Sequence, residues 1–386
     1  MAEKTIDHKS RAHALLSASS AHRWLACPAS AVAGEAYPQT ATAYTQEGTT
    51  AHEVAEIVAR ERQQGRSPDL YSYSGWPEGT TKEMINHAHG YADYIEELKK
   101  DNNAAVLFEQ RVDFSAWVPE GFGTCDCIIL QDKTLTVIDY KYGAGVPVSA
   151  EANPQLRLYG LGAYNDYSTA FDVEKVEMHI YQPRLNNISD DSITVEELLT
   201  WANGTVAPIA QKAVKGKGGY CAGEQCRWCP HAGRCRTLSK ACTEYVETHS
   251  LRVGVPVLAP HEIANVLEME PLITLWLKKV KAQALDTLLD GGEVPGYKAV
   301  EGRGTRTWAD DMRVIEVLRD NGYTAEDYLK TELHSPAGLE AQIGKKQVAE
   351  LLGGVIVKKP GSPTVAKETD RREPINRRDE IMKDFN

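Results

Sequence analysis

A predicted β-hairpin with acidic residues constrains this chain more than any other segment. Asp126 lies in the run GFGTCDCIIL, and Asp139 and Lys141 lie in LTVIDYK; both runs indicate strands, with a turn at 131–133. Because side chains on a strand alternate between faces, Asp139 and Lys141 share one face. A short hairpin then places Asp126 beside Asp139 on the neighbouring strand.

These residue types suit metal-assisted cleavage of a phosphodiester bond. Carboxylates hold a hard divalent cation such as Mg²⁺ or Mn²⁺ through oxygen. A lysine beside them steadies the attacking water and offsets charge on the phosphate. On the hairpin residues alone, a solvated surface strand with an exposed Asp and Lys is the alternative.

Helical patterns flank the hairpin on both sides. Upstream, Thr49 or Thr50 can cap a helix that places His52 in its first turn. Downstream, Asn153-Pro154 opens a helix on which Gln155 and Tyr159 point the same way, since they are four residues apart.

The segments 105–112 and 172–181 indicate further strands, one before the hairpin and one after the second helix. The order helix, three strands, helix, strand predicts an α/β fold with a small mixed sheet flanked by helices. Glu109, on the first strand, is either an additional active-site carboxylate or a solvated strand residue, and the pattern favours the solvated one.

The order of these elements resembles the RecB-like branch of the PD-(D/E)xK nucleases. That branch has the ordered motifs Gly-Thr-x-x-His, Gly-x-x-Asp, Asp-x-Lys and Gln-x-x-x-Tyr. The chain has all of them, in order: 48–52, 123–126, 139–141 and 155–159. The resemblance implies the restriction-endonuclease-like core of these enzymes.

The resemblance also implies roles for single residues. His52, Asp126, Asp139 and the backbone carbonyl of Tyr140 would bind the metal. Lys141 would be catalytic together with the two aspartates. Gln155 and Tyr159 would contact DNA or brace the lysine.

Cysteines gather in a second region of interest. The chain has eight, and Cys226, Cys229 and Cys235 form a close set with Cys221 just before them and Cys27 far upstream. The N-terminus lacks the apolar core of a signal peptide, and no apolar run is long enough to cross a membrane. We therefore expect a cytoplasmic protein in which clustered cysteines bind metal rather than form disulfides.

The spacing leaves both the metal and its fourth ligand open. Four thiolates suit Zn²⁺ and an iron–sulfur cluster equally, and either Cys221 or Cys27 could complete the set. Iron–sulfur RecB-like nucleases of the CRISPR-adaptation and AddB type use one N-terminal cysteine and three beyond the core. This resemblance implies a [4Fe–4S] cluster on Cys27, Cys226, Cys229 and Cys235.

The remaining cysteines and one aromatic residue have simpler interpretations. Cys125 and Cys127 flank Asp126 and are expected to be buried packing residues on the strand face opposite to it. Cys242 is expected to be a helix residue without a metal role. Trp228, between two proposed thiolate ligands, is expected to cover the cluster.

Length and composition allow one sizeable domain and a smaller one. We expect a nuclease domain over 1–247, a mainly helical domain with a hairpin over 258–356, and an extended tail over 357–386. Pro271 is expected to break or kink the long helical stretch after 260. This layout resembles a phage and prophage family known as a domain of unknown function.

The net charge of −11 does not favour a protein that coats nucleic acid, but a nuclease needs only a local basic strip. Basic residues that could line a DNA path are Arg157, Arg184, Lys212, Lys215, Lys217, Arg227 and Arg234.

The expected function is a metal-dependent DNA nuclease, an exonuclease of phage recombination or replication in the bacterial host cytoplasm. Its partner would be DNA with single-stranded character or free ends, together with a recombination or single-strand-binding protein, and no membrane. The alternative is a non-catalytic iron–sulfur or zinc DNA-binding module of a larger complex.

Overall fold

The computed structural model describes residues 14–37, 43–100, 103–248, 260–299, 315, 319–320, 340 and 344–352. The chain divides into two compact units, Met1–Tyr328 and Leu329–Asn386. Within the second unit the structure describes one helix, α13 (Lys345–Leu352). The sheet, the other helices and the candidate sites all lie in the first unit.

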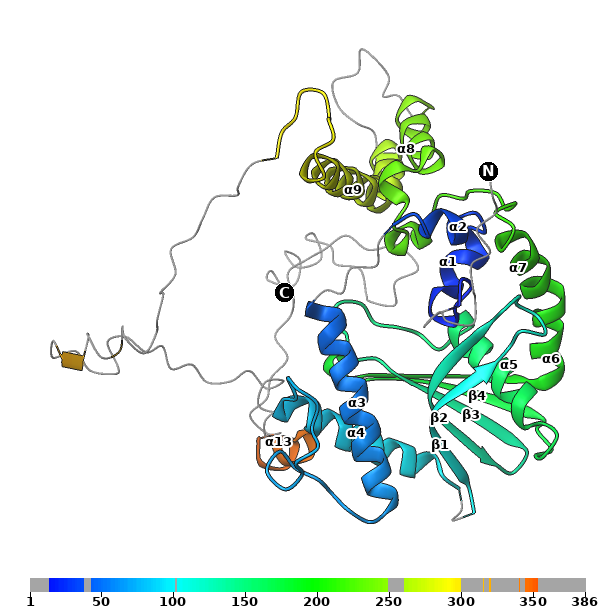
Figure 1. Cartoon of the computed structure of the whole chain (residues 1–386), viewed down its shortest axis with the longest axis vertical. Coiled ribbons are helices and arrows are strands. Elements are labelled where there is room, and N and C mark those ends of the chain that lie inside the picture. The colour runs from blue at the N-terminus through cyan, green and yellow to red at the C-terminus, as the bar shows by residue number, and fades with distance from the viewer. Residues whose placement is uncertain are drawn as a thin grey trace, which may run out of the picture. The chain divides into compact units, whose positions relative to one another are not determined.

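A five-stranded mixed sheet forms the centre of the first unit, with its strands in sequence order across the sheet (Figure 1). Neighbouring strands are antiparallel except for the β3–β4 pair, which is parallel. The β2–β3 hairpin turns at Asp132 and Lys133, whose positive φ angles match the tight turn expected there. The strands are β1 (Ala105–Asp113), β2 (Phe122–Gln131), β3 (Thr134–Tyr140), β4 (Lys175–Gln182) and β5 (Asn187–Thr194).

Helices α3 (Ala43–Gln63) and α4 (Lys82–Leu98) cover one face of the sheet. Thr81 caps α4 by accepting a hydrogen bond from the backbone N–H of Met84. The apolar stripes of both helices bury against Cys127, Ile138 and other side chains of the sheet. His52 lies well inside α3.

The opposite face is covered by α5 (Pro154–Tyr167), which connects the parallel strands β3 and β4. Asn153 caps this helix through hydrogen bonds from the N–H groups of Gln155 and Leu156. Further short helices extend this layer and share its apolar core: η2 (Ala18–Ser20), α1 (Ala21–Ala26), α2 (Ser30–Gly34), α6 (Val195–Trp201), the π-helical turn η4 (Ala202–Val206) and α7 (Ala207–Ala213).

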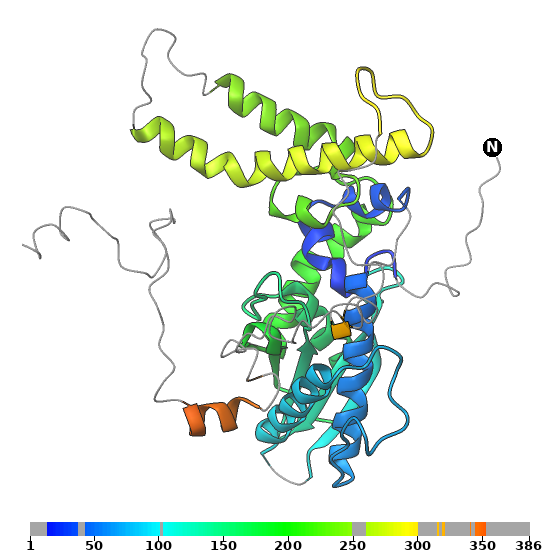
Figure 2. The ribbon, with the colours of Figure 1, turned by 90° about the vertical axis from the view of Figure 1, so that its left-hand side faces the viewer.

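A smaller apolar cluster holds the cysteine-rich segment against α9 (Pro260–Leu289). Leu272, Leu275 and Trp276 of α9 pack on Cys226, Cys229 and their neighbours. Helices α8 and α9 lie side by side beyond this segment (Figure 2). The other elements here are η5 (Glu224–Trp228), η6 (Ala232–Arg234) and α8 (Arg236–Thr248).

The α/β fold with a mixed sheet and the order of its first elements confirm the sequence prediction, and two local predictions were wrong. Helix α3 begins at Ala43, so Thr49 is interior and donates its hydroxyl hydrogen to the Thr45 carbonyl oxygen instead of capping. Helix α9 continues through Pro271, which removes one N–H donor without ending the helix. The predicted hairpin lies mostly outside the described residues, and 297–299 are not in a strand.

Candidate metal centre

Acidic residues from three neighbouring strands lie in one row across the sheet. The β1–β2 register pairs Phe108 with Cys127 and Gln110 with Cys125, so Glu109 faces Asp126. The β2–β3 register ends at the pair of Cys127 and Ile138, so the next position sets Asp126 beside Asp139. Like charges directly opposite one another destabilise a sheet unless a proton or a cation lies between them.

The ladder is interrupted where this row crosses it. Glu109 has a φ of 50°, and the pair it would form with Asp126 is absent from the β1–β2 ladder. Cys125 packs in the core on the α5 side and Cys127 in the core on the α3 and α4 side. Both are fully buried, as expected, but they lie on opposite faces because the interruption breaks the strict alternation of side chains.

His52 completes a candidate metal-binding group with two members of the row. Ligand atoms of His52, Glu109 and Asp126 all lie within 4.8 Å of one another. The His52 Nδ1 lies 3.3 Å from Asp126 Oδ1, and the second oxygen, Asp126 Oδ2, accepts the backbone N–H of Tyr140 at 2.7 Å. An imidazole and two carboxylates form a donor set that binds divalent cations.

The pKa values of His52, Glu109 and Asp126 are shifted by burial and by the charges of one another. Burial alone would lower the pKa of His52, but the Asp126 carboxylate outweighs it and raises that pKa to about 9. Burial, and then the charge of Asp126, raise the pKa of Glu109 to about 7. Burial opposes ionisation of Asp126, yet His52 and the N–H of Tyr140 lower its pKa. The metal-free site therefore holds protons where a divalent cation would bind.

Asp139 is buried and makes its contacts on the α5 side. Its Oδ2 lies 2.8 Å from Lys141 Nζ, and its Oδ1 accepts a hydrogen bond from Gln155 Nε2 at 2.9 Å. Lys141 Nζ also donates to Gln155 Oε1 at 3.2 Å, and Gln155 Nε2 donates to Tyr159 Oη at 3.3 Å. Gln155 thus holds the Asp139–Lys141 ion pair from the first turn of α5.

Charge is balanced within this pair. Burial raises the pKa of Asp139, although Lys141 opposes that rise. Burial alone would lower the pKa of Lys141, but Asp139 outweighs it, so the pKa of the ammonium is raised and it stays protonated. A permanently charged lysine beside a carboxylate is suited to hold an anionic phosphate.

A second candidate metal site lies in the cysteine-rich segment. A small cavity is lined by Cys27, Cys226, Cys229 and Cys235, which come from α1's C-terminal end and from the segment around η5 and η6. Cys221 also lines it. Burial raises the pKa of Cys226 and of Cys229, so a metal must displace protons there.

Two contacts distinguish Cys27 from Cys221. Cys27 is buried, and its Sγ accepts a hydrogen bond from the backbone N–H of Cys221 at 3.3 Å. Cys221 is exposed, and its own Sγ is directed at the carbonyl of Ala222 at 3.7 Å. Because its sulfur is buried at the cavity while that of Cys221 is exposed, Cys27 is the better placed ligand.

The basic residues proposed for a DNA path separate into two groups. Arg184 lies 3.1 Å from Glu47 and 3.5 Å from Glu83, and Arg157 lies 3.9 Å from Asp191. Their charges are already balanced by these carboxylates. The proposed basic residues of the second group, in the 212–236 segment, are exposed. Trp228 is 65% exposed and is not among the residues that line the cavity between the thiols, so the expectation that it covers them was wrong.

The sequence interpretation placed Glu109 on a solvated strand surface, whereas the side chain is half-buried and lies in the candidate metal-binding group. Alternation along β1 could not reveal this, because the interrupted ladder redirects the side chain. The usable signal was register: counting back from the β1–β2 connection at 114–121 places Glu109 opposite Asp126.

The comparisons with known proteins identify a family without assigning an activity. Residues 13–373 match the model described as "Protein of unknown function (DUF2800)", and the chain belongs to that family. A solved structure titled "Crystal structure of SSO0001" is similar at 15% identity and a TM-score of 0.22, covering 49% of this chain and 85% of that chain. A TM-score this low supports no conclusion. No helix among the described residues is long and apolar enough to span a membrane.

We expect Mn²⁺ binding to release protons near neutral pH. With pKa values of about 9 for His52 and about 7 for Glu109, binding at pH 7 should release roughly 1.5 protons. Affinity should rise with pH up to about 9, because proton competition falls as His52 deprotonates. Titration calorimetry in two buffers of different ionisation enthalpy measures the release.

Two variants make this measurement specific. Glu109→Gln should reduce the release to about one proton and weaken binding, since one ligand and its proton are lost. Glu53→Gln, at an exposed position of α3 next to His52, is the matched control and should behave as wild type. Binding without proton release would show that the cation does not occupy this group.

Proposed function

We propose that this protein is a metal-dependent DNA nuclease with a PD-(D/E)xK core of the RecB-like type. The observation that carries the proposal is the row formed by Glu109, Asp126 and Asp139, which ends at the ion pair of buried Asp139 with half-buried Lys141. Three carboxylates, a histidine and a half-buried lysine side by side are costly to hold together in a fold, and metal-assisted hydrolysis of a phosphodiester gives them a purpose.

The residues fit a divalent cation, Mg²⁺ or Mn²⁺. His52, Glu109 and Asp126 would hold it, with Asp139 at the next position of the row. When bound, the cation supplies Lewis-acid stabilisation of a phosphate oxygen. The Tyr140 N–H fixes the orientation of Asp126 by its hydrogen bond, so the carboxylate presents its other oxygen to the group.

Lys141 and its partners act on the phosphate itself. The lysine stays protonated beside Asp139, so its ammonium can offset negative charge that develops on the phosphate oxygens. Gln155 fixes the lysine and the aspartate relative to each other through separate hydrogen bonds from its amide oxygen and nitrogen. Tyr159 in turn contacts Gln155, which limits the rotation of the amide.

We propose, on the resemblance, that the four thiols hold a [4Fe–4S] cluster rather than a single zinc ion. Cys27, Cys226, Cys229 and Cys235 line one small cavity, so one group could bind all four. We assign the cluster a structural role.

The resemblance extends the proposal to an exonuclease that acts on free or single-stranded DNA ends during phage recombination or replication. The alternative is a non-catalytic module that binds DNA through its iron–sulfur or zinc site. The Asp139–Lys141 pair favours catalysis, because binding alone gives no reason to hold a half-buried lysine against a buried carboxylate in the midst of other acids.

The test is cleavage of end-labelled single- and double-stranded DNA by anaerobically purified protein. We expect cleavage with Mg²⁺ or Mn²⁺ and none with EDTA. Progressive shortening from one end would establish an exonuclease. Binding of the same DNA without cleavage in either metal would contradict the nuclease proposal and favour the binding module.

A further inference from the structure

One stretch of this acidic chain is strongly basic. Residues 211–236, from the end of α7 to the start of α8, contain six Lys or Arg residues and a single acid, Glu224. The whole chain carries a net charge of −11. Positive charge concentrated in one segment of an acidic protein indicates a local binding surface for an anion rather than a general solubilising surface.

The cations of this stretch are free of carboxylate partners within the described residues. Lys212, Lys215, Lys217 and Arg227 are exposed, and none of them forms an ion pair there. Some exposed lysines elsewhere are paired, namely Lys133 with Asp172 and Glu174, Lys175 with Glu177, and Lys240 with Glu244, whereas others, among them Lys82, Lys100 and Lys278, are not. An unpaired cation attracts a phosphate without first giving up a carboxylate.

Exposed aromatic rings lie among these cations. Trp228 is 65% exposed and Tyr220 is 46% exposed. The ring centroids of Tyr220 and His231 lie 5.8 Å apart, and this contact restrains one edge of the Tyr220 ring. Large aromatic side chains beside unpaired cations are the two components that proteins use to bind unpaired nucleotides.

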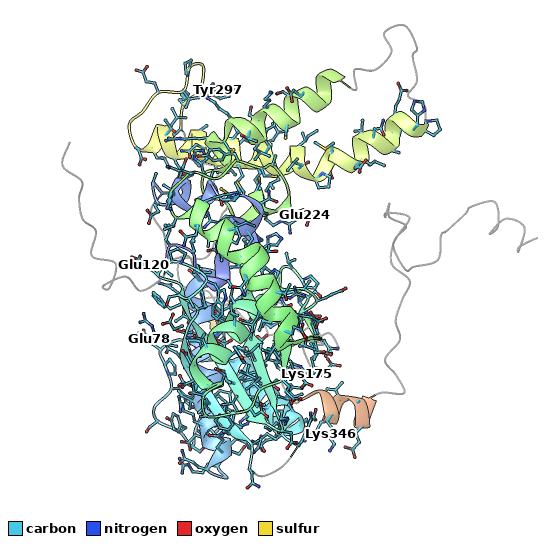
Figure 3. All side chains as sticks on the ribbon, turned by 90° about the vertical axis from the view of Figure 1, so that its right-hand side faces the viewer. Glu78, Glu120, Lys175, Glu224, Tyr297 and Lys346 are labelled. Atoms are coloured by element: carbon cyan, nitrogen blue, oxygen red, sulfur yellow. The ribbon has the colours of Figure 1, made fainter. Side chains whose placement is uncertain are left out.

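The fold holds the stretch in a fixed path over α1 and α2 (Figure 1). Gly218 approaches Pro28 so closely that a Cβ there would lie 2.2 Å from the proline Cβ. The N–H of Cys221 donates to Cys27 at the end of α1. The stretch, called the strip below, is therefore held at these two points against the end of α1, and Figure 3 labels Glu224, its one acidic residue.

We propose that this strip, with Lys212, Lys215, Lys217, Tyr220, Arg227 and Trp228, binds a single strand of DNA. The cations contact phosphates, and the rings of Trp228 and Tyr220 stack on bases. Stacking requires bases with a free face, so the strip selects unpaired strands over duplex. That the bound strand is a substrate rests on the proposed nuclease function. The binding surface itself is inferred from the charge and exposure of these side chains.

The test is fluorescence anisotropy with a labelled oligothymidine and a hairpin duplex of equal length, in buffer without divalent metal. The triple variant Lys212→Glu/Lys215→Glu/Lys217→Glu should weaken single-strand binding at least tenfold and lower the salt dependence. Trp228→Ala should weaken it about tenfold, with recovery in Trp228→Phe. The matched control, Lys133→Glu/Lys175→Glu/Lys240→Glu, changes the net charge equally and should retain binding.

Three outcomes would overturn the proposal. The first is an equal loss in the control variant, which would show that only net charge matters. The second is equal binding of duplex with no effect of Trp228→Ala. The third is loss of iron or zinc from the lysine variant together with binding, which would show that these cations serve to balance the thiolates.

A small substrate separates this proposal from the nuclease proposal. Hydrolysis of bis(p-nitrophenyl) phosphate does not need a strip for a long strand, so the strip variants should retain it and Lys141→Ala should lose it. If the wild type hydrolyses neither this ester nor DNA, the nuclease proposal fails. Selective loss of strand binding in the strip variants would still support the surface.

Discussion

Asp139→Asn and Lys141→Ala should each reduce DNA cleavage by roughly 10²–10⁴-fold, the largest catalytic effects we expect from single substitutions. Asparagine retains the shape of Asp139 but removes the charge that Lys141 faces at 2.8 Å. Alanine removes the ammonium that offsets charge on the phosphate. Initial rates of cleavage in Mn²⁺, with DNA in excess, measure both effects.

Loss of folding must be separated from loss of chemistry, because each single variant breaks an ion pair whose carboxylate is buried and whose lysine is half-buried. Removing one partner costs up to about 3–5 kcal/mol where the remaining charge is fully buried, and less where it reaches solvent. The double variant Asp139→Asn/Lys141→Met removes both charges and should recover thermal stability while remaining inactive. Activity that returns with stability in the double variant would contradict the catalytic assignment.

Matched controls lie on the same hairpin. Asp132→Asn and Lys133→Ala change the same residue types at its turn, where Lys133 is exposed. Both should retain the wild-type cleavage rate. A rate within about threefold of wild type for Asp139→Asn or Lys141→Ala would remove these residues from the site, since the expected loss is at least about 10²-fold.

The hairpin was predictable because its geometry is local. Period-2 alternation and a two-residue turn set the positions of Asp126, Asp139 and Lys141 once both strands are recognised. The sequence predicted that Gln155 could brace Lys141, but not the geometry of their contact, because that geometry depends on how the crossover helix packs on the sheet. The helix cap at Asn153 brings Gln155 into position, and that signal was visible in the sequence.

Other features depend on tertiary structure that no local pattern encodes. Helix α3 runs through Gly48 and two threonines because its buried residues, among them Val54 and Val58, pack on the sheet. Edge strand β5 has alternating charged and polar residues, DDS among them, which resemble a loop. Its pairing with β4 decides its conformation.

The spacing of the cysteines did not decide whether Cys27 or Cys221 is the fourth ligand, and the structure favours Cys27. We expect Cys27→Ser to lose the metal cluster and Cys221→Ser to keep it. The Cys27 thiol is buried at the cavity and accepts an N–H, whereas that of Cys221 is exposed. Iron, sulfide and zinc content, measured on anaerobically purified protein, decides between them. The matched control is Cys242→Ser, because Cys242 is a buried cysteine in the apolar cluster around this segment. This variant should keep its metal.

Loss of the cluster should lower stability before it changes the chemistry of cleavage. A clip from Cys27 to the 226–235 thiols closes a loop of about 200 residues, and the free energy of metal binding contributes directly to folding. Cys27→Ser should therefore melt well below wild type, while the fraction that remains folded still needs Mg²⁺ or Mn²⁺ to cleave. If Cys221→Ser loses the cluster while Cys27→Ser retains it, the two ends of the core are not joined through metal. A cleavage rate that follows the oxidation state of an intact cluster, at constant melting temperature, would point to redox control instead of a structural role.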